Sequence, residues 1–143
     1  MVDHKLFARS LADIRSALAR IRSKLPSTRH AFLEDQDARD IVVLNLFVAL
    51  QHTIALATHW LAELGLDVPE RSAEVFRALA KHQILDAELA ERLASAAGLR
   101  DLIAHRYGML DWERIYEIAA TELDDLDLYS QALARAVDDA GSP

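Results

Sequence analysis

The sequence of 143 residues contains no cysteine, only four glycines and three prolines, and aromatic side chains make up 6% of it. The absence of cysteine excludes a disulfide framework and any cysteine-ligated zinc or iron–sulfur site, and it suits a reducing cytosol. The scarcity of glycine and proline leaves few positions at which a helix must end. A chain of this length is typical of one domain, so we expect a single domain over residues 1–143.

A long uninterrupted apolar run is also missing. Charged side chains are scattered through the first 30 residues, which excludes the apolar core of a signal peptide. The most apolar stretch, residues 41–50, contains Asn45 and is followed by Gln51 and His52. It therefore falls short of the roughly 20 apolar residues that a membrane-spanning helix needs. We expect a soluble, cytoplasmic protein that does not enter a membrane.

Acidic side chains outnumber basic ones by 23 to 16, and the net charge of −7 argues against a protein coated in basic surface for nucleic acid. The distribution is uneven, because residues 1–30 carry seven basic and two acidic side chains. The basic ones are Lys5, Arg9, Arg15, Arg20, Arg22, Lys24 and Arg29. This asymmetry indicates either a local surface for nucleic acid or a partner, or a solvated helix face with an uneven share of arginine. The late aspartates are expected to form a solvated, fraying face: Asp124, Asp125, Asp127, Asp138 and Asp139.

Apolar residues recur at spacings of three and four along the whole chain, which predicts helices that each bury one stripe. The first such helix ends at Pro26 and carries Arg15 and Arg22 on its polar face, with Arg29 following at the same spacing. The second runs from about residue 37 to residue 64 and is apolar on most sides, so we expect it to be the central helix.

Three further helices follow the central one. Their expected boundaries are Gly65 after the second helix, Pro69 at the start of the third, Asp86 and Asp111 as N-caps of the fourth and fifth, and Gly108 at the end of the fourth. The fifth keeps a helical rhythm from Ile115 to Tyr129, and no run alternates like a strand. The sequence therefore predicts an all-α, up-and-down bundle of four to five helices.

Residues 98–107 interrupt the apolar fourth helix with a group of chemically active side chains. Asp101 and His105 lie four residues apart on one face, so the carboxylate can fix the tautomer of the imidazole. Arg100 lies about 140° around the axis from His105, but its long side chain can bend toward the same cleft, and Tyr107 falls on the side of Arg100.

These residue types suit cleavage of a phosphodiester. The histidine can move a proton to or from a ribose hydroxyl, and the arginine can bind the phosphate and stabilise its developing charge, with no metal or cofactor required. Taken as residue types alone, the set is also explained by a surface Asp–His pair on a helix, worth about 0.3–0.5 kcal/mol.

The order of these residues resembles a known motif. The segment from Arg100 to His105, followed by Arg106 and Tyr107, is similar to the R-x4-H-x-Y motif of HepT-like proteins, which belong to the HEPN superfamily of helical ribonucleases. The likeness extends over about residues 3–130, including the central helix at 45–51 and 54–61, Gly65, Pro69, and residues 76–79 and 89–93.

The resemblance implies a concrete function. Proteins of this family usually form homodimers that bring the arginine and histidine of both subunits together in a cleft, and many are toxins that cleave RNA without metal. Their partner is a minimal nucleotidyltransferase antitoxin, thought to add AMP to the motif tyrosine, here Tyr107. Carried over, Arg100 would position the phosphate and His105 would act as acid or base.

Some positions depart from the family pattern. Asp101 stands where the family often has asparagine, so it is expected to support the site while adding negative charge beside the phosphate. Gln51 and Ala55 fall where acidic residues are expected in the central helix. Weaker RNA contacts are expected from Arg15, Arg22 and Arg106.

Two other interpretations compete with this one. The alternative to the ribonuclease is a non-catalytic helical interaction protein that binds nucleotide or a nucleotidyltransferase. His52, His59 and Glu63 share helical spacing that suggests a metal site, but bundle metal sites usually draw Glu-x-x-His pairs from several helices, and buried histidines are the commoner explanation. Trp60 and Trp112 are expected to be packing residues.

Overall fold

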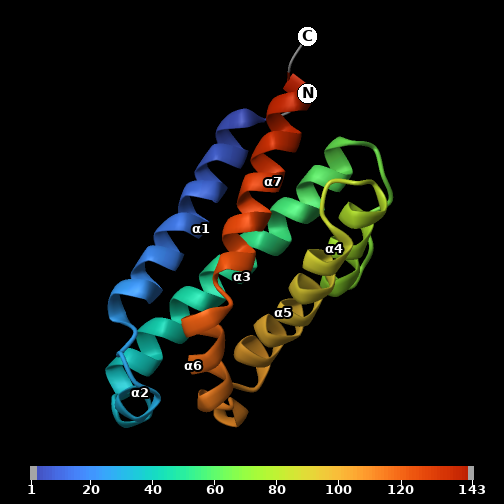
Figure 1. Ribbon diagram of the computed structural model, residues 1–143. Helices are drawn as coiled ribbons and strands as arrows, with labels where there is room; N and C mark the ends of the chain where they lie inside the picture. Colours follow the sequence, from blue (N-terminus) through green and yellow to red (C-terminus); the bar gives the residue numbers. More distant parts are fainter. Residues whose placement is uncertain (1–2, 142–143) are drawn as a thin grey trace.

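The computed structural model describes residues 3–141 and is all-helical over that range, which confirms the predicted fold class (Figure 1). Within it lie seven α-helices and one 3₁₀ turn. Their bounds are α1 His4–Lys24, α2 Arg29–Glu34, α3 Gln36–Glu63, α4 Ser72–Lys81, α5 Ala87–His105, η1 Tyr107–Met109, α6 Trp112–Thr121 and α7 Asp124–Gly141.

Two of these helices were not expected as separate elements. Helix α2 is six residues long and begins at Arg29, shortly after Pro26, and the Thr28 hydroxyl caps it by accepting a hydrogen bond from the Ala31 backbone N–H. The expected fifth helix is divided into α6 and α7, because α6 ends at Thr121 and the chain turns at Glu122 and Leu123 before α7 begins. The prediction of four to five helices was therefore too low.

Helix α3 is the central element, as predicted. It begins after the N-cap Asp35 and ends one residue before Leu64, and Gly65 then adopts the left-handed conformation with φ of 73°. It packs against α1, α4 and α5 and also contacts α2 and α6. Its buried residues include Leu46, Leu50 and Trp60.

By length and composition, α3 is the one helix in the described part of the chain that is long and apolar enough to cross a membrane. The apolar stretch at residues 41–50 was expected to be too short to span a membrane, but the whole of α3 is long enough. Half of its most apolar window is buried inside the molecule. The buried half packs against α1, α4 and α5, as expected for the core helix of a bundle.

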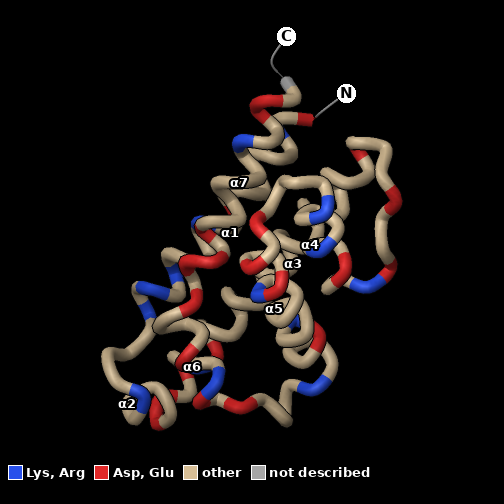
Figure 2. The backbone as a smooth tube through the Cα atoms, turned by 45° about the vertical axis from the view of Figure 1, so that its right-hand side comes forward, with Lys and Arg blue, Asp and Glu red and all other residues tan. Residues whose placement is uncertain are grey.

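Helices α1 and α7 lie side by side along one flank of α3 (Figure 1). Arg22 of α1 donates hydrogen bonds to Asp124 at 3.3 Å and Asp127 at 2.7 Å, both on α7. Arg92 of α5 pairs with Asp125 at 3.1 Å. The expectation that these three aspartates form only a solvated, fraying face was therefore wrong, because they join helices. Figure 2 shows the basic segments of α1 close to the acidic ones of α7.

Helices α4 and α5 form an antiparallel pair that presents the motif. Arg77 of α4 binds Glu91 of α5 at 2.8 Å, and Asp86 caps α5 as predicted, accepting from the Leu89 N–H. Helix α5 ends at His105, three residues earlier than Gly108. Tyr107 therefore lies on the η1 turn rather than on the helix, and the expected shared side with Arg100 does not apply.

Candidate functional site

Arg100 is held in place by residues from two other helices. Its guanidinium donates one hydrogen bond to Gln51 Oε1 on α3 and one to Ser72 Oγ at the start of α4, each 2.8 Å long. The Arg100 side chain is only 20% exposed. Because a guanidinium has five N–H donors, two such bonds fix its direction and leave others for an incoming anion.

Asp101 turns toward Arg100 rather than toward His105. Its Oδ1 lies 2.9 Å from Arg100 Nε, which makes an ion pair, although the Nε–H does not point at the carboxylate and has no hydrogen-bond acceptor. Among residues 3–141, no hydrogen bond or ion pair joins Asp101 to His105. The expected Asp–His pair is therefore not formed, and the negative charge of Asp101 acts on the arginine.

His105 is the last residue of α5 and is exposed. It lies five positions after Arg100, which places it about 7.5 Å further along the helix axis. Within the described part of the chain its imidazole has no hydrogen-bond partner. It is thus free to exchange a proton with a bound substrate.

Tyr107 lies just beyond the helix end, and its hydroxyl donates a 2.9 Å hydrogen bond to Asp40 Oδ1 on α3. Its ring meets Trp112 edge-on with centroids 5.9 Å apart. Burial and the bond to Asp40 raise the pKa of Tyr107 above its ordinary value of 10.0, while the nearby charge of Arg39 lowers it in part. The phenol is therefore held neutral and in one orientation.

A shallow groove of about 350 Å³ lies beside Tyr107. Its lining is mainly apolar and comes from α3 and the end of α5: Asp40, Val43, Leu44, Phe47, Ile103 and Ala104. Leu44 is 61% exposed and Met109 is 70% exposed. Large apolar side chains so exposed beside charged site residues are typical of a contact surface.

The three arginines expected to bind RNA lie in different settings. Arg15 is exposed on α1, and Arg106 is exposed immediately after α5, next to His105. Arg22 is occupied by Asp124 and Asp127, so its charge is largely compensated within the chain.

The two histidines of α3, His52 and His59, contact different residues of α1. His52 Nε2 lies 3.7 Å from Asp13 on α1, whereas the His59 ring packs at 5.8 Å from Phe7. Between residues 3 and 141, no three potential metal-ligating side chains of histidine, aspartate or glutamate come together. Trp60 is 2% exposed and is a packing residue, as predicted.

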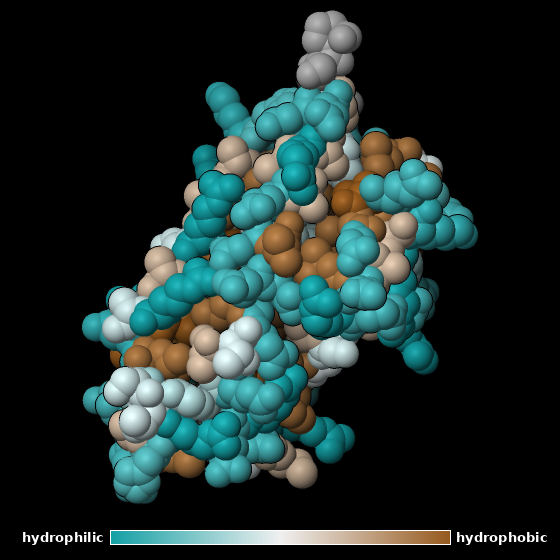
Figure 3. Space-filling model, in the orientation of Figure 1, coloured by the Kyte–Doolittle hydropathy of each residue, from teal (hydrophilic) through white to brown (hydrophobic). Residues whose placement is uncertain are grey.

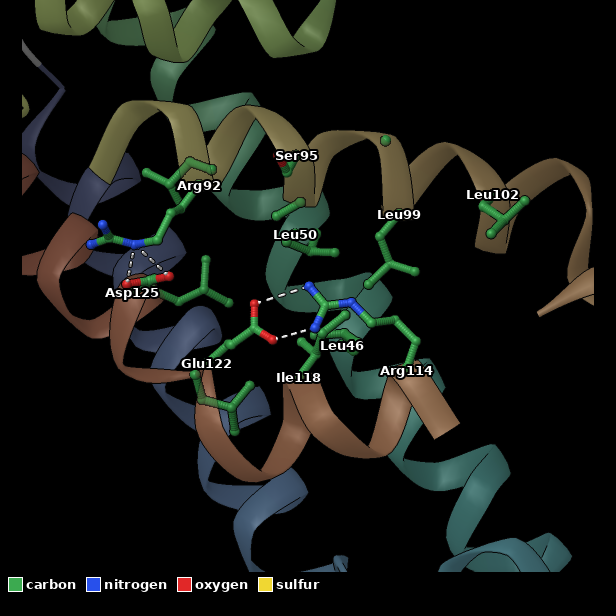
Figure 4. A pocket seen from close by; sticks show the side chains of 15 residues that line it. Leu46, Leu50, Arg92, Ser95, Leu99, Leu102, Arg114, Ile118, Glu122 and Asp125 are labelled. Atoms are coloured by element: carbon green, nitrogen blue, oxygen red, sulfur yellow. Dashed lines mark hydrogen bonds and ion pairs between the residues drawn. The ribbon is translucent and has the colours of Figure 1, made fainter. Parts of the chain in front are cut away.

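A second pocket of about 270 Å³ lies between α5 and the α6–α7 corner (Figure 4). Leucines from α3 form its floor, and the ion pairs of Arg92 with Asp125 and Arg114 with Glu122 cross its rim. Figure 3 shows apolar surface exposed among hydrophilic side chains on the face of the molecule drawn there. Arg100 does not line this pocket, because its side chain extends toward α3 and α4.

Comparison with known protein families identifies the family of this chain. The family model described as ribonuclease HepT-like matches residues 14–133. The chain belongs to the ribonuclease HepT-like family. That membership confirms the resemblance inferred from the motif between Arg100 and Tyr107, and with it a HEPN toxin fold.

Individual HepT relatives are similar over most or part of the chain. An mRNA nuclease HepT from Shewanella oneidensis is 25% identical over 119 residues, covering 83% of this chain and 89% of that protein. A tRNA nuclease HepT from Aphanizomenon flos-aquae is 32% identical over 79 residues, covering 55% and 54% respectively. A solved structure of a tri-AMPylated Shewanella oneidensis HEPN toxin in complex with an MNT antitoxin matches with a TM-score of 0.84 and 24% identity, covering 94% of this chain and 99% of that one. This last likeness shows the shared fold.

In this HepT-like chain, three hydrogen-bond partners of the motif side chains could not be predicted from the sequence. Gln51 was noted only as a departure from the family pattern, and Ser72 and Asp40 carried no signal of their own. They lie 49, 28 and 67 positions from their partners in the chain. Only the packing of α3, α4 and α5 brings them to Arg100 and Tyr107.

Proposed function

We propose that this HepT-like protein is a metal-independent endoribonuclease and the toxin of a pair with a minimal nucleotidyltransferase antitoxin. It acts in the cytoplasm, with the whole chain as one catalytic domain. The observation that carries the proposal is the contrast within the motif: Arg100 is fixed by Gln51 and Ser72, while His105 is exposed and unpartnered among the described residues. A fixed cation and a free proton carrier are what phosphodiester cleavage requires.

The mechanism assigns one step to each side chain. Arg100 holds the scissile phosphate through the N–H donors left free by Gln51 and Ser72 and stabilises the charge that develops on its oxygens. His105 takes the proton from the attacking ribose 2′-hydroxyl or gives one to the departing 5′-oxygen. Asp101 tempers the positive charge of Arg100 through their ion pair.

The active form is a homodimer that joins two copies across the outer face of α3 and the end of α5. The exposed Leu44 and Met109 support this surface because burying them against a second copy removes apolar area from water. Two Arg100–His105 pairs then border one cleft. A homodimer also supplies a proton donor and a proton acceptor from separate histidines.

RNA reaches this cleft along a limited basic surface. Arg106 adjoins His105, and Arg15 extends the positive charge along α1, whereas Arg22 contributes less because Asp124 and Asp127 neutralise it. With a net charge of −7 on the chain, binding depends on a few phosphate contacts and weakens as salt is added.

The antitoxin acts on Tyr107. Its hydroxyl is positioned two residues from His105, and a nucleotide attached there adds phosphate charge and bulk to the cleft. The AMPylated state named for the Shewanella oneidensis HEPN toxin supports this type of control.

The decisive experiment is cleavage of an mRNA transcript and of unmodified tRNA by the purified protein in EDTA. We expect cleavage by wild type, and a loss of about 100-fold or more in the Arg100→Ala and His105→Ala variants. Arg135→Ala on the exposed side of α7 and His82→Ala on an exposed turn are the matched controls. Equal cleavage by wild type and His105→Ala would refute the catalytic assignment and leave a non-catalytic interaction protein.

A further inference from the structure

The hydrogen bond between Tyr107 and Asp40 suggests a role for Asp40 in the modification of Tyr107, and this inference rests on the proposed function. We infer that Asp40 is the general base for that modification, taking the phenolic proton as the tyrosine oxygen attacks a nucleoside triphosphate. The carboxylate thus belongs to the modified protein itself rather than to the transferase.

The geometry satisfies what a base needs. Asp40 Oδ1 already accepts the hydrogen bond of the Tyr107 hydroxyl at 2.9 Å, within the 2.6–3.2 Å at which a proton passes directly. Trp112 packs edge-on against the tyrosine ring and keeps it turned toward α3. The tyrosine residue is 45% exposed, so a transferase can approach its side chain from solvent.

The electrostatics explain why a base is needed. Burial and the Asp40 bond raise the pKa of Tyr107, so almost no phenolate exists at neutral pH. A neutral phenol is a weak nucleophile, and its proton must leave as the new bond forms. Asp40 is the group that already holds this proton and can accept it during the transfer.

The step balances in atoms and charge. The Tyr107 Oη–phosphorus bond forms while the bond from the α-phosphorus to pyrophosphate breaks. The phenolic proton passes to Asp40 Oδ1 and then to water, which restores the carboxylate. The nucleoside triphosphate and its magnesium are brought by the transferase, and the chain contributes the nucleophile and the base.

The test compares Asp40→Asn with Asp40→Ala in the presence of ATP, magnesium and a minimal nucleotidyltransferase antitoxin that modifies the wild-type protein. Asparagine keeps an acceptor oxygen for the tyrosine hydroxyl but cannot take its proton. The initial rate of AMP addition is followed by intact mass, with Tyr107→Phe to identify the modified residue. Asp37→Asn, one turn earlier on α3 and exposed, is the matched control.

We expect both Asp40 variants to be modified about 100-fold more slowly than wild type, and Asp37→Asn to match wild type. If Asp40→Asn retains more than a tenth of the wild-type rate, the base lies in the transferase and the inference is overturned. Circular dichroism and gel filtration establish that the Asp40 variants fold. If wild type gains no AMP on Tyr107, the proposed modification itself is refuted. If wild type is modified and Asp40→Asn is modified as fast, only the role of Asp40 as base is refuted.

Discussion

The guanidinium of Arg100 donates a 2.8 Å hydrogen bond to the side-chain amide of Gln51, so a neutral oxygen on the central helix orients the proposed catalytic cation. A carboxylate at this position would neutralise the arginine that must bind phosphate. An amide fixes the direction of the guanidinium and leaves its charge uncompensated from that side. Position 51 therefore serves orientation, while within residues 3–141 the one carboxylate paired with Arg100 is that of Asp101.

Removing the two oxygen partners of Arg100 should slow RNA cleavage. In Gln51→Ala and Ser72→Ala the guanidinium loses one fixed contact each, and we expect kcat to fall about tenfold in each variant, since a hydrogen bond to a charged group is worth about 1.5–3 kcal/mol. Single-turnover cleavage of the same transcript measures this loss. Gln131→Ala, a solvent-facing glutamine on α7, is the control, and unchanged kcat in both variants would contradict the orienting role.

A charge on the outer face of α3 should separate the proposed homodimer. Leu44 is 61% exposed in the single chain, and Leu44→Lys would force an ammonium into the proposed contact. We expect the variant to elute as a monomer and to lose most RNA cleavage, while its thermal unfolding stays close to that of wild type. Light scattering coupled to gel filtration measures the mass. Leu128→Lys, on the exposed side of α7, is the comparison, and a dimeric Leu44→Lys protein would place the interface elsewhere.

The core should weaken measurably when one buried hydroxyl is removed. Tyr129 is fully buried, and its hydroxyl donates a 2.7 Å hydrogen bond to the Thr53 carbonyl, which joins α7 to α3. Tyr129→Phe should lower the free energy of unfolding by about 1 kcal/mol. Urea unfolding followed by circular dichroism gives this difference. A variant as stable as wild type would mean that the bond contributes nothing net.

The same residue should make the protein sensitive to alkali. Burial raises the pKa of Tyr129 well above 10.0, so the folded protein keeps a proton that the unfolded chain releases. The stabilisation is complete below about pH 10 and declines as the pH rises toward the folded-state pKa. We expect the stability advantage of wild type over Tyr129→Phe to narrow steadily above pH 10. A gap that stays constant from pH 8 to pH 11 would contradict this linkage.

Titration of Tyr107 should depend on Asp40. Burial raises the pKa of this phenol first, and the hydrogen bond and negative charge of Asp40 raise it further. Asp40→Asn removes that charge, so the Tyr107 pKa should move downward. Tyrosinate absorbance against pH, taken as the difference from Tyr107→Phe in each background, isolates this group. An unchanged midpoint would mean that burial alone sets the pKa.

Local signals predicted much of the helical framework. Pro26, Gly65, Asp86 and Asp111 mark element ends because each acts on its own neighbours through a cap, a left-handed turn or a missing N–H. The apolar period identified α3 as central. Helix α2 escaped because six residues give too little period to recognise, although Thr28 provides a cap signal.

Other features depend on packing between distant segments. The break at Glu122 has no glycine or proline, and the apolar rhythm continues through it, so nothing local separates α6 from α7. Arg114 reaches Glu122 at 2.6 Å across α6 and braces the corner. The partners of Arg100 and Tyr107 escaped for the same reason, since periodicity tells which face a residue occupies but not which helix lies opposite.

The closeness of Tyr107 to His105 in the chain bears on how a nucleotide attached to Tyr107 would inhibit RNA cleavage. A nucleotide joined to the tyrosine hydroxyl would be tethered next to the proposed cleft, because only Arg106 lies between the two residues in the chain. It would compete with RNA as a tethered ligand, at an effective local concentration in the millimolar range set by a short linker. Free AMP added to the unmodified protein would have to reach a similar concentration to compete as well, whereas the covalent bond keeps the nucleotide at the site whatever its concentration in solution.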